Sequence, residues 1–247
     1  EEWRAGIGRL LGPGAKPLAA DIEQLLAPYR AAVSAENEAG ALAVYPGSPL
    51  IAQYLMRAQD TLVANELHPE ERAELEAALG RDRRVKVMGL DGWIALKSLL
   101  PPKERRGVVL IDPPFEQEGE LARLADGLAE GLQRFATGIF IAWYPIKDPK
   151  PVARFRDGLA ETAGRPLLGI ELMTRRPDDP DRLNGCGLVV ANPPFTLQAE
   201  LAAILPELSA RMAQDGGGQH RLERLANPLR DGEKSSPDAK RRLRTRH

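Results

Sequence analysis

Residues 108–116 read VVLIDPPFE, and this stretch narrows the fold and function of the chain more than any other. The four apolar residues before Asp112 suit a strand that is buried on both faces of a parallel sheet. Such a strand would deliver Asp112 to the carboxyl edge of the sheet, where open α/β sheets bind ligands. Pro113 and Pro114 fix φ near about −65° and cannot donate ladder hydrogen bonds, so the chain must leave the sheet there. We therefore expect Phe115 to be presented to a ligand rather than buried.

An acidic acceptor, a free carbonyl and an aromatic face suit a flat base that carries an exocyclic amine. The Asp112 carboxylate and the Pro113 carbonyl can accept the two N–H groups of that amine, while Phe115 stacks on the ring. The tetrapeptide resembles the Asp/Asn-Pro-Pro-aromatic motif of amino-methyltransferases, which implies methylation of adenine N6. Taken alone, it is equally compatible with a solvated Asp at a proline-rich strand exit.

A second copy of the motif occurs in residues 188–195, LVVANPPF, where Asn192 takes the place of the carboxylate. Strand order has to decide between the two copies. Apolar runs predict strands at residues 61–66, 84–88, 107–111, 138–143, 167–173 and 187–191, which alternate with helices and indicate a mainly parallel sheet. In amino-methyltransferases the reactive motif follows the fourth of seven strands. If this chain lacks the first strand, Asp112 follows strand four, and Asn192 after strand seven is a structural strand exit.

Composition agrees with a soluble globular protein. The chain has 247 residues, 43% of them hydrophobic, and a net charge of −1. No apolar run approaches the roughly 20 residues of a membrane span, so we expect a cytoplasmic protein. The single cysteine, Cys186, is expected to be a buried structural thiol, and the three scattered histidines predict no metal site.

The pattern of apolar and turn residues divides the chain into three parts. Residues 1–60 are predicted to be a helical insertion or leader, in which Ser48 caps a helix that Pro49 starts and that runs to about Gln59. Residues 61–215 are predicted to form the α/β domain. Residues 216–247 are polar and basic, which predicts a disordered tail with a possible role as a phosphate-binding arm.

Two further carboxylates are predicted at strand ends before Asp112. Glu66 and Asp91 end the two preceding strands and would open into the same crevice. Glu66 suits the ribose of S-adenosylmethionine, whereas Asp91 suits its adenine amine and Gly92 leaves space for the ring. A single acid at a strand end is more often a helix cap, but three at successive strand ends favour a site.

Several long blocks of the sequence, in collinear order, resemble the RlmJ-type methyltransferases of 23S ribosomal RNA. The blocks are YPGSPLIA (45–52), ELHP (66–69), LDG (90–92), RRGVVLIDPPFE (105–116), RFATGIFIAWYPI (134–146), IEL (170–172) and the late NPPF. The resemblance implies a Rossmann-like, S-adenosylmethionine-dependent class I methyltransferase acting on adenine N6. It implies cofactor-binding roles for Ser48, Glu66, Asp91, Gly92 and Asp112, and catalytic roles for Asp112, Pro113 and Phe115. The implied partner is 23S rRNA, free or partly assembled rather than in the intact ribosome.

The chain also departs from the family pattern. No glycine-rich cofactor loop follows a strand, and the first strand of the family is not found. That strand would lie centrally, between those bearing Glu66 and Asp112, so its absence is expected to leave unpaired edges and exposed apolar surface. The last 32 residues are expected to lie outside the family pattern. The alternatives are a DNA adenine-N6 methyltransferase and a non-catalytic nucleic-acid-binding module.

Overall fold

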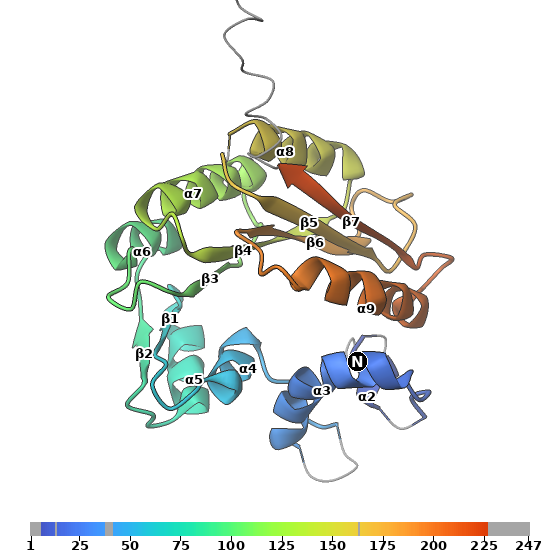
Figure 1. Ribbon diagram of the computed structural model, residues 1–247, viewed down its shortest axis with the longest axis horizontal. Coiled ribbons are helices and arrows are strands. Elements are labelled where there is room, and N and C mark those ends of the chain that lie inside the picture. Colours follow the sequence, from blue (N-terminus) through green and yellow to red (C-terminus); the bar gives the residue numbers. More distant parts are fainter. Residues whose placement is uncertain (1–5, 13, 38–41, 163, 227–247) are drawn as a thin grey trace, which may run out of the picture.

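A computed structural model describes residues 6–12, 14–37, 42–162 and 164–226 (Figure 1). Its helices are α2 (Gly8–Leu11), α3 (Ala20–Ala35), α4 (Ser48–Leu55), α5 (Pro69–Leu79), α6 (Gly92–Leu99), α7 (Glu120–Arg134), α8 (Pro149–Thr162) and α9 (Leu197–Met212). Its strands are β1 (Leu62–Asn65), β2 (Val85–Met88), β3 (Val108–Ile111), β4 (Ile139–Ile146), β5 (Leu167–Met173), β6 (Gly185–Ala191) and β7 (Gln219–Ala226). Strands and helices alternate from β1 to β5, which confirms the predicted α/β class.

The strands form two sheets. β1 and β2 are a parallel pair, and the larger sheet has the order β3-β4-β6-β5-β7. Within it, β3, β4 and β5 run in the same direction, whereas β6, which lies between β4 and β5, and β7, which pairs with β5, run antiparallel to them. The predicted parallel direction therefore holds for β3, β4 and β5, and β6 and β7 depart from it. The physical reason is that β5 and β6 are joined by a loop without a crossover helix, which permits antiparallel pairing.

The main core lies between the larger sheet and helices α7 and α8. β4 alternates half-buried and buried side chains, and the buried ones belong to Phe140, Ala142, Tyr144 and Ile146. α7 buries leucines at helical spacing, Leu124, Leu128 and Leu132, in the same cluster. Figure 1 shows α7 and α8 on one side of this sheet and α9 on the other, where Leu205 packs with Leu168 and Val190. Both faces of the sheet centre are thus covered, which fixes the strand ends in place.

The two sheets leave open edges where they approach each other. β1 is paired only with β2, and β3 only with β4, within the described part of the chain. On these strands Val63 is 47% exposed, Leu110 47% and Val108 62%. The unpaired edges and exposed apolar side chains that the sequence led us to expect are therefore present within the described residues.

The amino-terminal helices pack beside the α/β part. α2 and α3 lie against α9, where the Arg9 guanidinium donates to the carbonyl oxygens of Arg211 and Ala213 at 2.9 and 2.6 Å. α4 begins at Ser48 and ends at Leu55, four residues earlier than predicted. Its N-cap is Gly47 rather than Ser48, because the chain turns into the helix one residue sooner.

Residues 219–226 form strand β7 and are not part of a disordered tail, contrary to the prediction for 216–247. β7 pairs with β5 along its length and is also held by charge. The buried guanidinium of Arg156 on α8 forms ion pairs with Glu171, at 3.1 Å, and with Glu223 of β7. The polar composition of this strand misled the prediction, because only Leu222 and Leu225 pack on the core while Glu223 is held by the buried Arg156. The basic residues of the predicted arm, from 227 onward, lie outside the described residues.

Candidate active site

β3 delivers Asp112 to the carboxyl edge of the larger sheet. Ile111, the last residue of β3, pairs with Ala142 of the parallel strand β4, so Asp112 follows beside Trp143. No group among the described residues donates a hydrogen bond to the Asp112 carboxylate. The residue is solvent-exposed, yet partial burial of its carboxyl raises the pKa above the usual range for Asp. Asp112 is therefore a free acceptor with strengthened affinity for a proton.

The turn after Asp112 has an unusual backbone. Pro113 is half-buried, and within the described chain its carbonyl oxygen accepts no hydrogen bond. Phe115 has a φ of +55°, in the left-handed region that few non-glycine residues adopt. Its ring is half-buried and meets Trp143 edge to face, with centroids 5.8 Å apart and planes at 67°. Phe115 is thus less fully presented than the sequence predicted, because Trp143 covers part of the ring.

Trp143 and Cys186 complete this neighbourhood, and the sequence did not single them out for it. Burial raises the pKa of the Cys186 thiol, a hydrogen bond with Trp143 lowers it, and the nearby Asp112 carboxylate raises it further. The half-buried thiol agrees with a structural role. Trp143 is linked to both Cys186 and Phe115, so its indole is held from two sides. The only signal in the sequence was an aromatic residue near the end of the neighbouring strand, whose register was not known.

Glu66 follows the end of β1, and Asp91 lies in the loop after β2. Hydrogen bonds of the Asn65 side chain join these two regions. The Asn65 amide donates to the Leu90 carbonyl at 2.8 Å, and its oxygen accepts from the Leu90 N–H at 3.0 Å. One Glu66 carboxylate oxygen accepts the backbone N–H of His68 at 2.8 Å. The Asn65 bonds therefore bring the loops that carry Glu66 and Asp91 together.

Asp91 is the N-cap of α6. Its Oδ1 accepts the backbone N–H groups of Trp93 and Ile94 at 2.9 and 3.1 Å, which leaves Oδ2 without a partner among the described residues. A Cβ atom added at Gly92 would meet nothing within 4 Å. A free carboxylate oxygen beside open space fits the amine and ring of an adenine. The structural role as a cap and the predicted role toward a cofactor are thus compatible.

Ser48 is exposed at the first turn of α4, a helix that packs against β1 and α5. No described hydrogen bond or ion pair links Ser48, Glu66 or Asp91 to Asp112. The predicted residues therefore form two groups, one on the β1–β2 sheet and its helices and one at the end of β3. The open edges of β1 and β3 separate these groups.

The second motif copy has a different environment. Because β6 runs antiparallel to β4, Asn192 lies at the edge where β3 and β4 begin, opposite to Asp112. Its side-chain amide donates to the carbonyl oxygens of Ala136 and Gly138 at 3.0 and 2.8 Å. These bonds support the prediction that Asn192 is a structural strand exit.

Two other findings on the described residues concern metal binding and membrane-spanning helices. They contain no group of three His, Cys, Asp or Glu side chains placed to bind a metal ion. Their helices also include none with both the length and the apolar character that a bilayer crossing requires.

The alternating strands and helices of this fold, together with the comparisons below, are those of a Rossmann-like class I methyltransferase. The model of the family described as "Ribosomal RNA large subunit methyltransferase D, RlmJ" matches residues 1–225. The chain belongs to this RlmJ family of ribosomal RNA large subunit methyltransferases. The match extends ten residues into the segment expected to lie outside the family pattern, so that expectation is wrong for residues 216–225.

Relatives with established names support this membership. The chain is 39% identical over 198 residues to the ribosomal RNA large subunit methyltransferase J of Escherichia coli, covering 80% of this chain and 71% of that protein. It is 38% identical over 223 residues to the protein of the same name from Haemophilus influenzae, covering 90% and 77%. A crystal structure of a Legionella pneumophila protein of the DUF519 family has a TM-score of 0.79 and 29% identity, with 91% of this chain and 81% of that chain covered. The protein is therefore a methyltransferase, and its family implies a methyl donor of the S-adenosylmethionine type.

Proposed function

We propose that the protein transfers a methyl group from S-adenosylmethionine to N6 of an adenine in 23S rRNA, with residues 112–115 as the motif that binds the target amine. The observation that carries this proposal is the pair of free acceptors at the strand exit. The Asp112 carboxylate and the Pro113 carbonyl both lack donors in the described structure. An exocyclic amine has two N–H groups, and binding both would leave the nitrogen lone pair free to face the methyl group of the bound cofactor.

Asp112 is also suited to receive the proton that the amine loses on methylation. Partial burial raises the pKa of its carboxyl, so the carboxylate holds a proton more firmly than an exposed Asp would. A base whose pKa lies closer to the working pH is a better proton acceptor in a transition state. In this proposal, Asp112 orients the amine first and then accepts its proton.

Phe115 provides the stacking surface for the target base. Its edge-to-face contact with Trp143 holds the ring in one orientation, which lowers the entropy cost of stacking. Stacking of a base on an aromatic side chain is worth roughly 1 to 3 kcal/mol. The arrangement requires an adenine that is unpaired or flipped out of its helix.

Ser48, Glu66, Asp91 and Gly92 would hold the cofactor, with Asp112 at its reactive end. The free Oδ2 of Asp91 and the open space at Gly92 support adenine binding, and the second oxygen of Glu66 remains available for ribose hydroxyls. When bound, the cofactor supplies an electrophilic methyl group. Ser48, Glu66, Asp91 and Gly92 bind and orient it, and none of these four residues has to change protonation state.

The test is methylation of unmodified 23S rRNA by the full-length protein, with N6-methyladenosine quantified by mass spectrometry after nuclease digestion. Asp112→Asn keeps the shape but loses the base and is expected to lower the rate by at least about 100-fold. Asp126→Asn replaces an exposed Asp on α7 and is the matched control, with an expected rate within twofold of wild type. Full activity of Asp112→Asn would contradict the proposed role.

Substrate class is tested in the same assay. Free 23S rRNA, assembled large subunits and adenine-containing duplex DNA compete for the full-length protein at equal concentrations of adenine target. We expect methylation of the free rRNA to dominate. A methylated base other than N6-methyladenine, or preferential methylation of DNA, would overturn the proposal.

A further inference from the structure

Phe195, the aromatic residue of the second motif copy, is 97% exposed. The other exposed large apolar side chains of the described residues have exposures between 46% and 62%. A fully solvated phenyl ring forgoes about 2 kcal/mol of burial energy. The catalytic chemistry at Asp112 does not use this ring, because it lies at the opposite edge of the sheet.

The ring is displayed by a rigid turn. Asn192 has a φ of +52°, and its amide is fixed by the carbonyl oxygens of Ala136 and Gly138. Pro193 and Pro194 restrict the next two φ angles. The Pro194 carbonyl accepts the N–H of Leu197 at 3.1 Å, which ties the turn to the start of α9. Phe195 therefore projects from a well-defined backbone and not from a loose loop.

Backbone bonds join this turn to the loops that precede β3, β4 and β5. The Gly107 carbonyl accepts the N–H of Ile139 at 3.0 Å, and the Asn192 amide reaches the Gly138 carbonyl at 2.8 Å. The Asn192 N–H donates to the Pro166 carbonyl at 3.0 Å. Residues 103–107, 134–138, 164–166 and 192–196 thus lie at the same edge of the larger sheet, and we name them the distal edge.

The distal edge carries unneutralised positive charge. Lys103, Arg105, Arg106 and Arg165 are exposed, and within the described chain their side chains form no ion pair or hydrogen bond. Glu104 is the one acidic residue in these segments. Such cations attract a polyanion, because phosphate binding releases condensed counterions.

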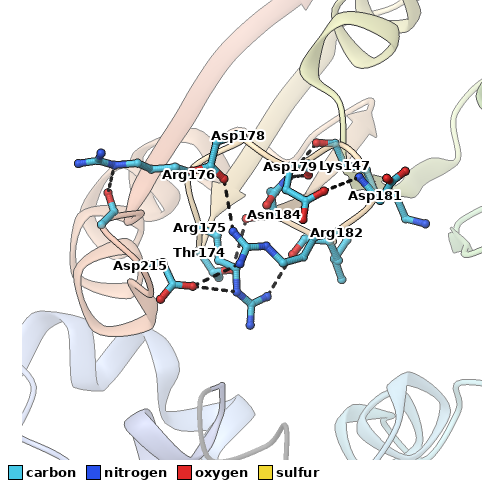
Figure 2. Close-up of polar contacts among 12 residues, drawn as sticks. Lys147, Thr174, Arg175, Arg176, Asp178, Asp179, Asp181, Arg182, Asn184 and Asp215 are labelled. Carbon is cyan, nitrogen blue, oxygen red and sulfur yellow. Dashed lines mark hydrogen bonds and ion pairs between the residues drawn. The ribbon is translucent and has the colours of Figure 1, made fainter.

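Two arginines of the loop between β5 and β6, at the opposite edge of the sheet, differ from the cations of the distal edge because they form ion pairs. Residues 174–184 contain three arginines and three aspartates. Figure 2 shows Arg175 and Arg182 converging on Asp215, at 3.7 and 3.5 Å, and Arg182 also pairs with Asp178 at 3.4 Å. Those arginines are already neutralised, whereas the cations of the distal edge are available to a partner.

We infer that the distal edge is a second RNA-binding surface, on which Phe195 stacks on an unpaired base and Arg105, Arg106 and Arg165 bind backbone phosphates. Stacking needs an unstacked base, so the partner is a single-stranded or looped segment rather than a duplex. This inference rests on the proposed function in one respect: the RNA bound at the distal edge is part of the same 23S rRNA substrate.

The two RNA sites would be separated by the length of β3. Gly107 and Asp112 are five residues apart, which corresponds to about 17 Å at roughly 3.3 Å per residue. A short RNA that carries only the target adenine cannot occupy both sites. The distal edge should therefore affect binding of long RNA and leave methylation of a minimal target unchanged.

The test uses a fluorescein-labelled 12-nucleotide single-stranded RNA of mixed sequence and its duplex form, with binding to the full-length protein followed by anisotropy. Phe195→Ala is expected to weaken single-strand binding by about 5- to 150-fold, the equivalent of one lost stack, and to leave duplex binding unchanged. Phe195→Trp should restore it. The triple substitution Arg105→Gln, Arg106→Gln and Arg165→Gln should reduce the slope of log K against log salt by about 2, at roughly 0.7 per phosphate.

Matched controls are Leu183→Ala, an exposed apolar residue, and Arg154→Gln, an exposed cation of α8. Both should bind like wild type, and thermal melts should show that all variants are folded. Single-strand affinity of Phe195→Ala within twofold of wild type, or an equal loss in the controls, would overturn the inference. The proposed function fails independently, through an active Asp112→Asn variant, since that measurement does not involve Phe195.

Discussion

Asn192 offers a direct test of the proposal that only the first motif copy is reactive. If its amide is structural, Asn192→Ala should destabilise the fold and leave catalysis by the folded protein unchanged. The substitution removes two hydrogen bonds, to the Ala136 and Gly138 carbonyls, and leaves the buried Gly138 oxygen without that donor. It also places an alanine at a φ of +52°.

The expected size follows from these two effects. Each hydrogen bond contributes about 0.5 to 1.5 kcal/mol, so the pair contributes about 1 to 3 kcal/mol. The left-handed backbone costs an alanine about 1 kcal/mol more than an asparagine, whose side chain tolerates that region. We expect Asn192→Ala to lower the free energy of unfolding by about 2 to 4 kcal/mol. Asn192→Gly loses the same bonds without the backbone strain and should be less damaging by about 1 kcal/mol.

Urea unfolding followed by circular dichroism measures these differences, and methylation rates are compared at a temperature where all variants are folded. Asn192→Ala and Asn192→Gly should keep rates within about threefold of wild type, while Asp112→Asn loses at least about 100-fold. An Asn192→Ala variant with wild-type stability and abolished methylation would refute the structural role and would make the second copy a candidate for catalysis.

Four other outcomes are expected. Trp143→Ala should raise KM for RNA more than it lowers kcat, because Phe115 loses the ring that orients it. Trp143→Phe should restore much of the affinity. Steady-state kinetics measure KM and kcat for both variants. Burial raises the pKa of Asp112, so its ionised form costs stability once the pH exceeds that pKa. Asp112→Asn should therefore melt at the same or a higher temperature than wild type at neutral pH, and this advantage should disappear in acid, where the carboxyl is protonated in both states. Because the edge of β3 is open, Val108→Lys combined with Leu110→Lys should reduce self-association of the 247-residue chain in sedimentation experiments. For the same reason, the unmodified 247-residue chain should bind S-adenosylmethionine weakly in calorimetry. Tight binding would contradict this last expectation.

The periodicity of apolar residues was sufficient to place most elements. Helix α5 occupies the predicted residues 69–79, and β5 the predicted residues 167–173. These elements depend on local pattern and on strong terminal signals, such as Pro69 at the start and Gly80 at the end of α5. β7 was missed because its polar residues are stabilised by buried ion pairs, which local pattern does not reveal.

The candidate site was only partly accessible from sequence. Counting strands selected Asp112, and strand ends indicated Glu66 and Asp91, because both inferences follow from chain order. The edge-to-face contact of Phe115 with Trp143, and the link from Trp143 to Cys186, depend on strands that are distant along the chain. No spacing in the sequence encodes such contacts.

By itself, therefore, the sequence determined the α/β class, the succession of strands along the chain from β1 to β6 and the residue types at their ends, since hydrophobic period and turn chemistry are local properties. Only the tertiary structure decided which edge each strand end occupies. The antiparallel direction of β6 turns one of two nearly identical motifs away from the other, so Asp112 and Asn192 meet different neighbours. Register and strand direction depend on long-range pairing, and they separate the free carboxylate of one motif from the bonded amide of the other.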